Sequence, residues 1–473
     1  MFLFFIIAFL YYIYNMVDKI LDYIEENSPR FLQDLKDLIR FETVTSSKEK
    51  IEEFKSASEF LVEKLKNIGF ENVQLLHTLG NPIVYGDKII NDKYETLLFY
   101  AHYDVQPAEP LDLWQSDPFV LQIKDGYMYG RGVADDKGML MSILHAFEYI
   151  FKNNIQIKYN IKILFEPSEE SCSHELEYIF SDKKTCKEYV DIFKCDTLVS
   201  CDSAMSFKDK PSITVGTRGC LSFEVTIYGP NKDVHSGIFG GYVGNPIHEL
   251  SRLLALVHDV NNHITIQNFY DGVETSVEDM RSCEENNIDE ESIKKELGVK
   301  DFVIEKGFSP QQASTLRPTF EVNGIFGGHT AEGGKTIIPR KVTAKISTRL
   351  VDKQDPIKIK QYIEKFFAKN IHPAFKFDIH SESNGCAATV TNVNFDVYNK
   401  LSRYISEVYG KDVVTVRMGG SLPIMNVLAK ALGCEIVFFG TSGPDSNCHG
   451  PNENLKIDDY NKAIVILVKL VTE

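Results

Sequence analysis

The chain has 473 residues, 43% of them hydrophobic, and a formal net charge of -16. A chain of this length can bury the cores of two or three domains, which excludes a small disulfide-stapled scaffold. The acidic residues are spread along the sequence, and this excess argues against nucleic acid or an anionic membrane as a partner. The nine cysteines are dispersed and never spaced as CxxC, which is typical of reduced thiols in a cytoplasmic compartment.

The first element is an uncharged apolar run, MFLFFIIAFLYYIY, at residues 1–14. It is shorter than the ~20 residues that a membrane-spanning helix needs. It also lacks the basic leader and the small-residue cleavage site of a secretory signal. Met16 then opens an amphipathic pattern that would start a soluble protein. The role of this leader, residues 1–16, stays open between an upstream extension, a signal for secretion and an anchor. Membrane contact is expected only if residues 1–14 act as an anchor.

From residue 17 to 210, strand-like and helix-like patterns alternate, which predicts the first part of an α/β domain. A buried strand in YETLLFYAHYD ends at His102 and Asp104, and a helix begins after Asp135 and Asp136. Two further strands end in the acidic stretches FEPSEES and SCDSA. Because ligands bind at the carboxyl ends of the strands in open α/β sheets, we expect these side chains to converge.

A different pattern occupies residues 211–391. Its strands and helices follow the order β-α-β-β-α-β, a split βαβ arrangement, which predicts an inserted α+β domain. The α/β pattern resumes in residues 392–473, with a strand, a loop that contains His449 and a final helix. The first domain is therefore expected to be discontinuous in sequence.

Five residues at predicted strand ends, helix starts or loops are candidate metal ligands: His102, Asp135, Glu170, Asp202 and His449. A single histidine at a strand end is more often an ordinary hydrogen-bonded group. Clustered carboxylates flanked by imidazoles, however, are usually neutralised by divalent cations. Two histidines and three carboxylates suit zinc, manganese or cobalt, and one carboxylate can bridge a pair of ions.

Five motifs, AHYDVQP, GRGVADDKG, FEPSEES, SCDSA and CHGPNE, occur in this order. Together they resemble the two-zinc aminoacylase and carboxypeptidase metallopeptidases. DVHSGIFGG, KTIIPRKV and STRLVDKQDP resemble the cytosolic nonspecific dipeptidase and carnosinase branch. The resemblance covers residues 17–473. It implies an α/β/α zinc-peptidase domain with an inserted lid and dimerisation domain, a homodimer, and hydrolysis of dipeptides with a free C-terminal carboxylate, such as Cys-Gly.

The resemblance also implies a role for each candidate ligand. Two zinc ions per subunit are expected, with His102 and Asp202 on one, Glu170 and His449 on the other, and Asp135 as the bridge. Asp104 would orient His102 from behind. The Asp135–Asp136 peptide is expected to be cis.

The same resemblance implies the residues that act on the substrate. Glu169 would be the catalytic base, and His235 would donate to the oxyanion, reaching across a dimer into the partner's site. Arg349, helped by Thr336 and Ser421, would clamp the substrate carboxylate with its planar guanidinium. His449 is also expected to contact the substrate.

Two departures from the family pattern leave the side-chain preference open: Met418 in RMGGS and the stretch SNGCAATV. An N-acyl-amino-acid hydrolase or a carboxypeptidase would use the same metal centre and remains an alternative. A non-catalytic scaffold is disfavoured because all five candidate ligands are present together with Glu169. The sequence contains no GxSxG and no HExxH, which argues against a serine hydrolase and against an HExxH metalloprotease.

Overall fold

The structure is a computed structural model, and it describes the chain with few gaps. The backbone is described for residues 2–473 except 46, 182, 209, 286–287 and 382, and the side chains of 2–15, 48, 181 and 183–185 are not described. The side chains of the apolar leader up to residue 15 are therefore not described. Among the residues that are described, no helix is long and apolar enough to cross a membrane.

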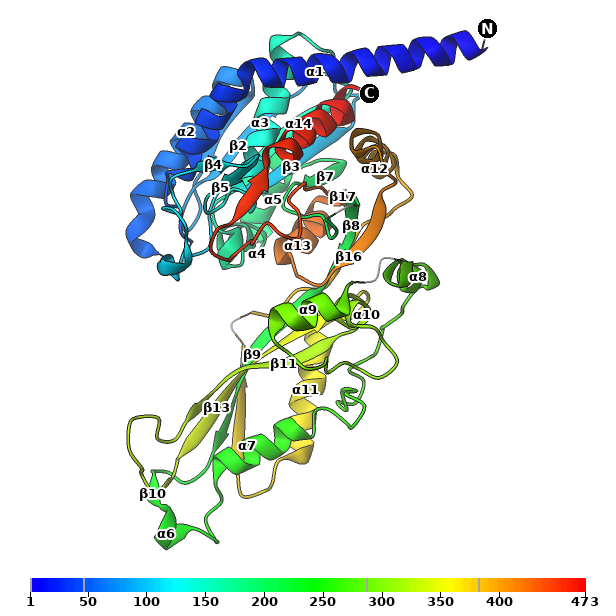
Figure 1. Ribbon diagram of the computed structural model, residues 1–473. Coiled ribbons are helices and arrows are strands. Elements are labelled where there is room, and N and C mark those ends of the chain that lie inside the picture. The colour runs from blue at the N-terminus through cyan, green and yellow to red at the C-terminus, as the bar shows by residue number, and fades with distance from the viewer. Residues whose placement is uncertain (1, 46, 182, 209, 286–287, 382) are drawn as a thin grey trace. The chain divides into compact units, whose positions relative to one another are not determined.

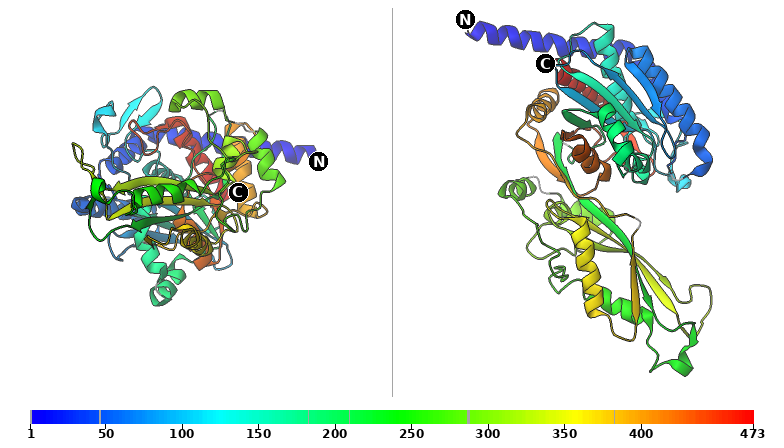
Figure 2. Two further views of the ribbon diagram at one scale, coloured as in Figure 1. Left: turned by 90° about the horizontal axis from the view of Figure 1, so that it is seen from below. Right: turned by 180° about the vertical axis from the view of Figure 1, so that it is seen from behind.

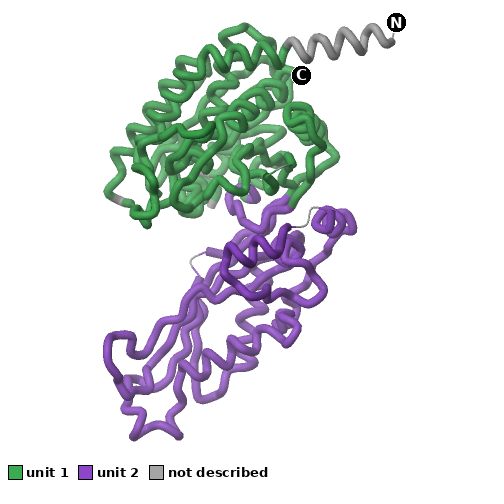
Figure 3. The backbone as a smooth tube through the Cα atoms, in the orientation of Figure 1, with its two compact units in different colours: residues 1–215, 391–416, 427–473 green, residues 216–390, 417–426 purple. Residues whose placement is uncertain are grey.

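The chain divides into two compact units (Figure 3). The first comprises residues 1–215, 391–416 and 427–473, and the second comprises residues 216–390 and 417–426. The first unit is thus interrupted in sequence by the second. The chain passes from one unit to the other within three elements: β8 (Ser212–Thr217), β16 (Val414–Met418) and α13 (Pro423–Leu432).

A six-stranded sheet forms the centre of the first unit, in the order β1-β2-β6-β3-β7-β17. Four of these strands, β6, β3, β7 and β17, are parallel to one another. At the other edge, β2 is antiparallel to β6, and β1 is antiparallel to β2. Their bounds are β1 Glu71–Leu76, β2 Ile83–Lys88, β3 Thr96–His102, β6 Asn160–Glu166, β7 Thr197–Ser200 and β17 Glu435–Phe438. A small sheet of β4 (Gln122–Lys124), β5 (Tyr127–Tyr129) and β18 (Asn454–Lys456) accompanies it.

Helices cover both faces of this sheet, as Figures 1 and 2 show. Their bounds are α1 Phe2–Ile39, α2 Ile51–Ile68, α3 Lys137–Lys152, α4 His174–Ser181, α5 Lys183–Phe193, α12 Asp396–Tyr409 and α14 Ile457–Thr472. Because successive strand residues point to opposite faces, Val84 of β2 joins the core under α3 while Tyr85 packs on Phe193 of α5. This burial on both sides explains why β3 is a continuous apolar run.

The second unit is built on an antiparallel sheet in the order β11-β13-β9-β14. Its strands are β9 Gly219–Tyr228, β11 Thr319–Gly327, β13 Lys341–Leu350 and β14 Lys376–His380. Apolar residues alternate along β9 and pack on α7 (Pro246–Ala255) and α11 (Pro356–Asn370). The sequence order β9-α7-β11-β13-α11-β14 is the expected split βαβ order. The predicted fold class, a discontinuous α/β domain with an inserted α+β domain, is confirmed.

Short elements complete the second unit. They are β10 Val234–His235, β12 Ile337–Ile338, β15 Thr389–Val390, α6 Ser236–Phe239, α8 Val277–Glu285, α9 Glu290–Leu297 and α10 Pro310–Thr315. β10 pairs with β12, with His235 opposite Ile337.

Candidate metal centre

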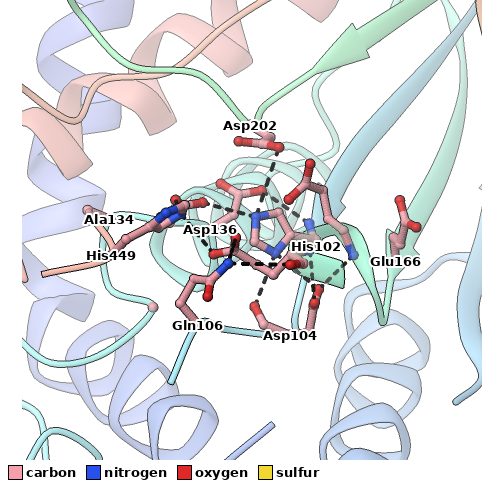
Figure 4. Close-up of polar contacts among 12 residues, drawn as sticks. His102, Asp104, Gln106, Ala134, Asp136, Glu166, Asp202 and His449 are labelled. Carbon is pink, nitrogen blue, oxygen red and sulfur yellow. Dashed lines mark hydrogen bonds and ion pairs between the residues drawn. The ribbon is translucent and has the colours of Figure 1, made fainter. Parts of the chain in front are cut away.

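His102 lies at the carboxyl end of β3 and is fully buried. Its Nε2 is 3.0 Å from Oδ1 of Asp135 and 4.0 Å from Oδ2 of Asp202. Figure 4 shows the imidazole between Asp202 on one side and Asp104 on the other. Because β3 and β7 are parallel neighbours, the residues that follow them meet at one edge of the sheet, as expected.

Asp135 connects two histidines through its two oxygens. Oδ1 faces His102, while Oδ2 lies 3.0 Å from Nε2 of His449. The same His449 nitrogen is 3.1 Å from Oε1 of Glu170. His449 has a φ of 63°, a left-handed conformation that costs energy for a residue with a side chain and that is often found at functional sites. The structure thus brings together all five residues that the sequence analysis selected as ligands.

The cluster has the donor set and the spacing of a cation site. Ligand atoms of His102, Asp135 and Glu170 all lie within 4.8 Å of one another, and so do those of His102, Glu169 and Asp202. Among the described residues, Oδ2 of Asp202 is buried without a hydrogen-bond partner. A buried carboxylate oxygen without a partner is costly, and a divalent cation would satisfy it. The residues present therefore fit a metal centre.

The pKa values within the cluster reflect its concentrated negative charge. Burial raises the pKa of Asp202 to about 7 and that of Glu169 well above its usual value. Hydrogen bonds to Asp135 and Glu170 raise the pKa of His449 to about 10. For His102, burial alone would lower the pKa, but hydrogen bonds to Asp104 and Asp135 raise it well above normal. The raised pKa values of Asp202 and Glu169 show that these two buried carboxylates lack compensating positive charge, which a bound cation would supply.

Asp104 contacts both His102 and the loop that carries Glu169 and Glu170. Its Oδ1 lies 3.3 Å from Nδ1 of His102, whose ring nitrogen is also 3.1 Å from the backbone oxygen of Asp104. The two carboxylate oxygens also accept the backbone N–H groups of Glu169 and Glu170, each at 3.1 Å. One buried carboxylate therefore fixes both a histidine and the loop that carries two further acidic side chains.

Three further residues contact the centre, and two of them, Gln106 and Glu453, were not singled out from the sequence. Nε2 of Gln106 donates to Oε2 of Glu170 at 2.8 Å. Glu453 accepts the backbone N–H groups of Ala134 and Asp135 at 2.8 and 3.0 Å. Asp136 accepts the backbone N–H of His102 at 3.2 Å, and the Asp135–Asp136 peptide is cis, as predicted. Gln106 and Glu453 belong to the motifs AHYDVQP and CHGPNE, which is the signal that could have identified them.

Apart from His449, the predicted substrate residues belong to the second unit and form two pairs. Nη1 of Arg349 donates to Oγ of Ser421 at 2.6 Å. His235 is exposed, and the backbone N–H of Ser236 beside it donates to the carbonyl oxygen of Thr336 at 3.0 Å. The structure thus associates Arg349 with Ser421 and His235 with Thr336.

The model of peptidase family M20/M25/M40 matches residues 98–473, most of the chain. The protein belongs to this family. It is therefore a peptidase, and the resemblance recognised in the motifs is confirmed. The match covers the motifs that supply every residue of the candidate centre, His102 to His449.

Similar proteins place the chain among metallopeptidases. The Cys-Gly metallodipeptidase of Candida albicans is 30% identical, with 94% of each chain covered. The Beta-Ala-His dipeptidase of Rattus norvegicus is 28% identical, covering 94% of this chain and 92% of the relative. Among solved structures, an M20 family metallo-carboxypeptidase from Sulfolobus solfataricus is 31% identical, with a TM-score of 0.82 over 93% of this chain and 98% of its own. The names of these relatives and the cluster of candidate ligands in this chain both indicate a metal-dependent enzyme.

Proposed function

We propose that this protein is a metal-dependent dipeptidase that cleaves the peptide bond of dipeptides with a free C-terminal carboxylate. The observation that carries the proposal is Asp135, whose two oxygens each lie 3.0 Å from a histidine at the edge of the sheet. Similarity to a Cys-Gly metallodipeptidase and a Beta-Ala-His dipeptidase supports dipeptides as the substrate class. The cytoplasmic location stays a prediction.

The metal centre is proposed to hold two zinc ions per subunit, with manganese or cobalt as alternatives. His102 and Asp202 would hold one ion, Glu170 and His449 the other, and Asp135 would bridge them. Support comes from the two oxygens of Asp135, which face different histidines. When bound, such ions acidify a water molecule and polarise a peptide carbonyl.

Glu169 is proposed as the general base. Its neighbour Glu170 already contacts His449 and Gln106 through its two oxygens, which suits a ligand. Ligand atoms of Glu169, His102 and Asp202 lie within 4.8 Å of one another. The carboxylate of Glu169 can therefore reach a water molecule that is held beside His102 and Asp202. It would take a proton from that water and return it to the nitrogen of the leaving amine.

Arg349 is proposed to bind the substrate carboxylate. Its guanidinium already donates to Ser421, a contact that orients the planar fork. A carboxylate is the group that such a fork binds with two parallel hydrogen bonds. The free C-terminus of a dipeptide would supply it.

A homodimer is proposed because the two pairs of substrate residues lie far apart within one chain. His235 pairs with Ile337, next to Thr336 and just before the start of β13, whereas Arg349 lies near the end of that strand. At a rise of ~3.3 Å per residue, the stretch from Lys341 to Arg349 spans about 26 Å, far more than a dipeptide. His235 would therefore act in the site of the partner subunit. The exposed apolar residues Val322, Ile325 and Phe326 on the edge strand β11 suit contact with a second copy.

Metal analysis combined with a substrate panel tests this function. The purified protein should contain two metal ions per chain, lose activity on chelation and regain it with zinc. It should hydrolyse dipeptides and show little activity on the matching N-acetylated amino acids. Preference for the acetylated compounds would refute the dipeptidase assignment.

A carboxypeptidase is the second candidate, since the similar Sulfolobus solfataricus structure is described as a metallo-carboxypeptidase. A series of peptides of two to five residues distinguishes the two activities. A dipeptidase should lose most of its kcat/KM at the third residue, whereas a carboxypeptidase should retain it.

A further inference from the structure

Two cysteines of the second unit face each other across a backbone pair. Cys220 lies on β9, and Cys386 lies in the segment before β15, 166 residues further along the chain. The N–H of Cys220 donates to the carbonyl oxygen of Cys386 at 3.0 Å, and the reverse hydrogen bond is 2.8 Å long. Their sulfur atoms are 3.4 Å apart, neither cysteine is in a disulfide, and both residues are partly exposed.

This pair has a geometry from which a disulfide can form. The Cα atoms of a hydrogen-bonded antiparallel pair lie about 5.5 Å apart, inside the range that disulfides span. An S–S bond is ~2.05 Å long, so the sulfur atoms need to approach by only a little more than an ångström. The partial exposure of both residues favours access by a small reagent.

The pair is next to the proposed carboxylate clamp. Cys220 is directly opposite Arg349 in the register of β9 and β13. The partner of Arg349, Ser421, donates through Oγ to the carbonyl oxygen of Gly219 at 3.3 Å. A shift of the backbone at residues 219–220 would therefore displace the group that orients the Arg349 guanidinium.

The pKa of the Cys220 thiol is lowered, which makes this thiol more reactive. A hydrogen bond from the Cys386 thiol, together with the charge of Arg349, lowers the pKa of Cys220 to about 7. The pKa of Cys386 is correspondingly raised, mainly by its hydrogen bond to Cys220. The lowered pKa favours the Cys220 thiolate, the form that attacks a disulfide.

We propose that Cys220 and Cys386 form a reversible thiol–disulfide switch that weakens binding of the substrate carboxylate when it is oxidised. The oxidant is a small-molecule disulfide such as glutathione disulfide. The Cys220 thiolate attacks one of its sulfur atoms and expels one thiolate, which leaves a mixed disulfide. Cys386 then loses its proton, attacks the Cys220 sulfur and expels the second thiolate. Two protein thiols are oxidised, and one disulfide is reduced to two thiols.

Oxidation acts on the clamp in two opposing ways. It removes the thiolate charge beside Arg349, which favours an incoming carboxylate, but this attraction is screened at a partly exposed site. It also draws residues 219–220 toward Cys386 and displaces Ser421, so that the charge-assisted hydrogen bonds of Arg349 are misdirected. The second effect is expected to dominate and to raise KM about 3- to 10-fold. This consequence rests on the proposed function of Arg349, whereas disulfide formation does not.

The experiment treats the intact protein with glutathione disulfide, blocks the remaining thiols and maps disulfides by mass spectrometry of proteolytic peptides. We expect a Cys220–Cys386 cross-link that dithiothreitol reverses, and a parallel, reversible rise in KM for a dipeptide. Cys386→Ser should abolish both responses. Cys434→Ser, which removes a thiol that hydrogen-bonds to Cys195, should leave both intact.

Two outcomes would overturn the switch: no Cys220–Cys386 cross-link, or a cross-link with unchanged KM. A measurement that does not depend on enzyme activity, the rate of Cys220 alkylation, tests this inference separately from the proposed function. Arg349→Ala should slow alkylation of Cys220 by iodoacetamide at pH 7, because the thiolate loses its positive neighbour. An unchanged alkylation rate would contradict the influence of Arg349 on the Cys220 thiolate, even in a preparation that hydrolyses no dipeptide.

Discussion

In the first unit, His102 and Asp104 are fully buried, and hydrogen bonds within the protein fix their orientation. In the second unit, His235 is exposed on a two-residue strand, and the only hydrogen bond shown for its ring among the described residues is a local one from the N–H of Gly237. The candidate ligand His102 is thus held by the core, while His235 has no comparable support. This difference agrees with our proposal that one chain supplies the metal centre and that a second subunit supplies His235 to the substrate site.

Replacement of Asp135 should have the largest effect. Asp135→Ala removes the carboxylate that would screen two cations from each other, so both metal content and activity should fall to background. Elemental analysis and dipeptide turnover check this. Asp445→Ala, an exposed acidic residue in the same loop as His449, is the control and should retain metal. Full metal occupancy in folded Asp135→Ala would contradict the bridge.

Glu169→Gln should separate chemistry from metal binding. The amide preserves the shape of the side chain but cannot accept the proton, so kcat should fall about 10²-fold or more with two metal ions retained. The neighbouring Glu170→Gln is the matched control and should lose metal as well, because Glu170 contacts His449. The base assignment is wrong if Glu169→Gln turns over at a near wild-type rate.

Arg349→Ala should have a smaller effect that is confined to substrate binding. Loss of a charge-assisted contact should raise KM about 10- to 100-fold, with the metal content unchanged. Dipeptide amides, which lack the free carboxylate, serve as control substrates, and on them the variant should match the wild type. An equal penalty on both substrates would place Arg349 outside carboxylate recognition.

Much of this organisation could be predicted from the sequence. The buried run of β3 and the acidic ends of neighbouring strands indicated both the sheet and the edge where ligands meet. The motifs that contain Gln106 and Glu453 could have drawn attention to these residues, but not to their hydrogen-bond partners, which lie in segments far apart in the chain. Glu453, for example, binds backbone N–H groups more than 300 residues earlier. Cys220 and Cys386 likewise have no sequence spacing that signals their pairing.

Subunit complementation tests most directly the claim that His235 completes the site of a partner. His235→Ala and Glu169→Gln, each inactive alone, are mixed under conditions of verified subunit exchange. Equal amounts should give about half mixed dimers with one intact site each, so roughly a quarter of wild-type activity per protomer should return. Mixing Glu169→Gln with Asp135→Ala is the control and should recover nothing, because both lesions lie in the chain's own metal centre. No recovery in verified mixed dimers of the first pair would contradict a site shared between two subunits.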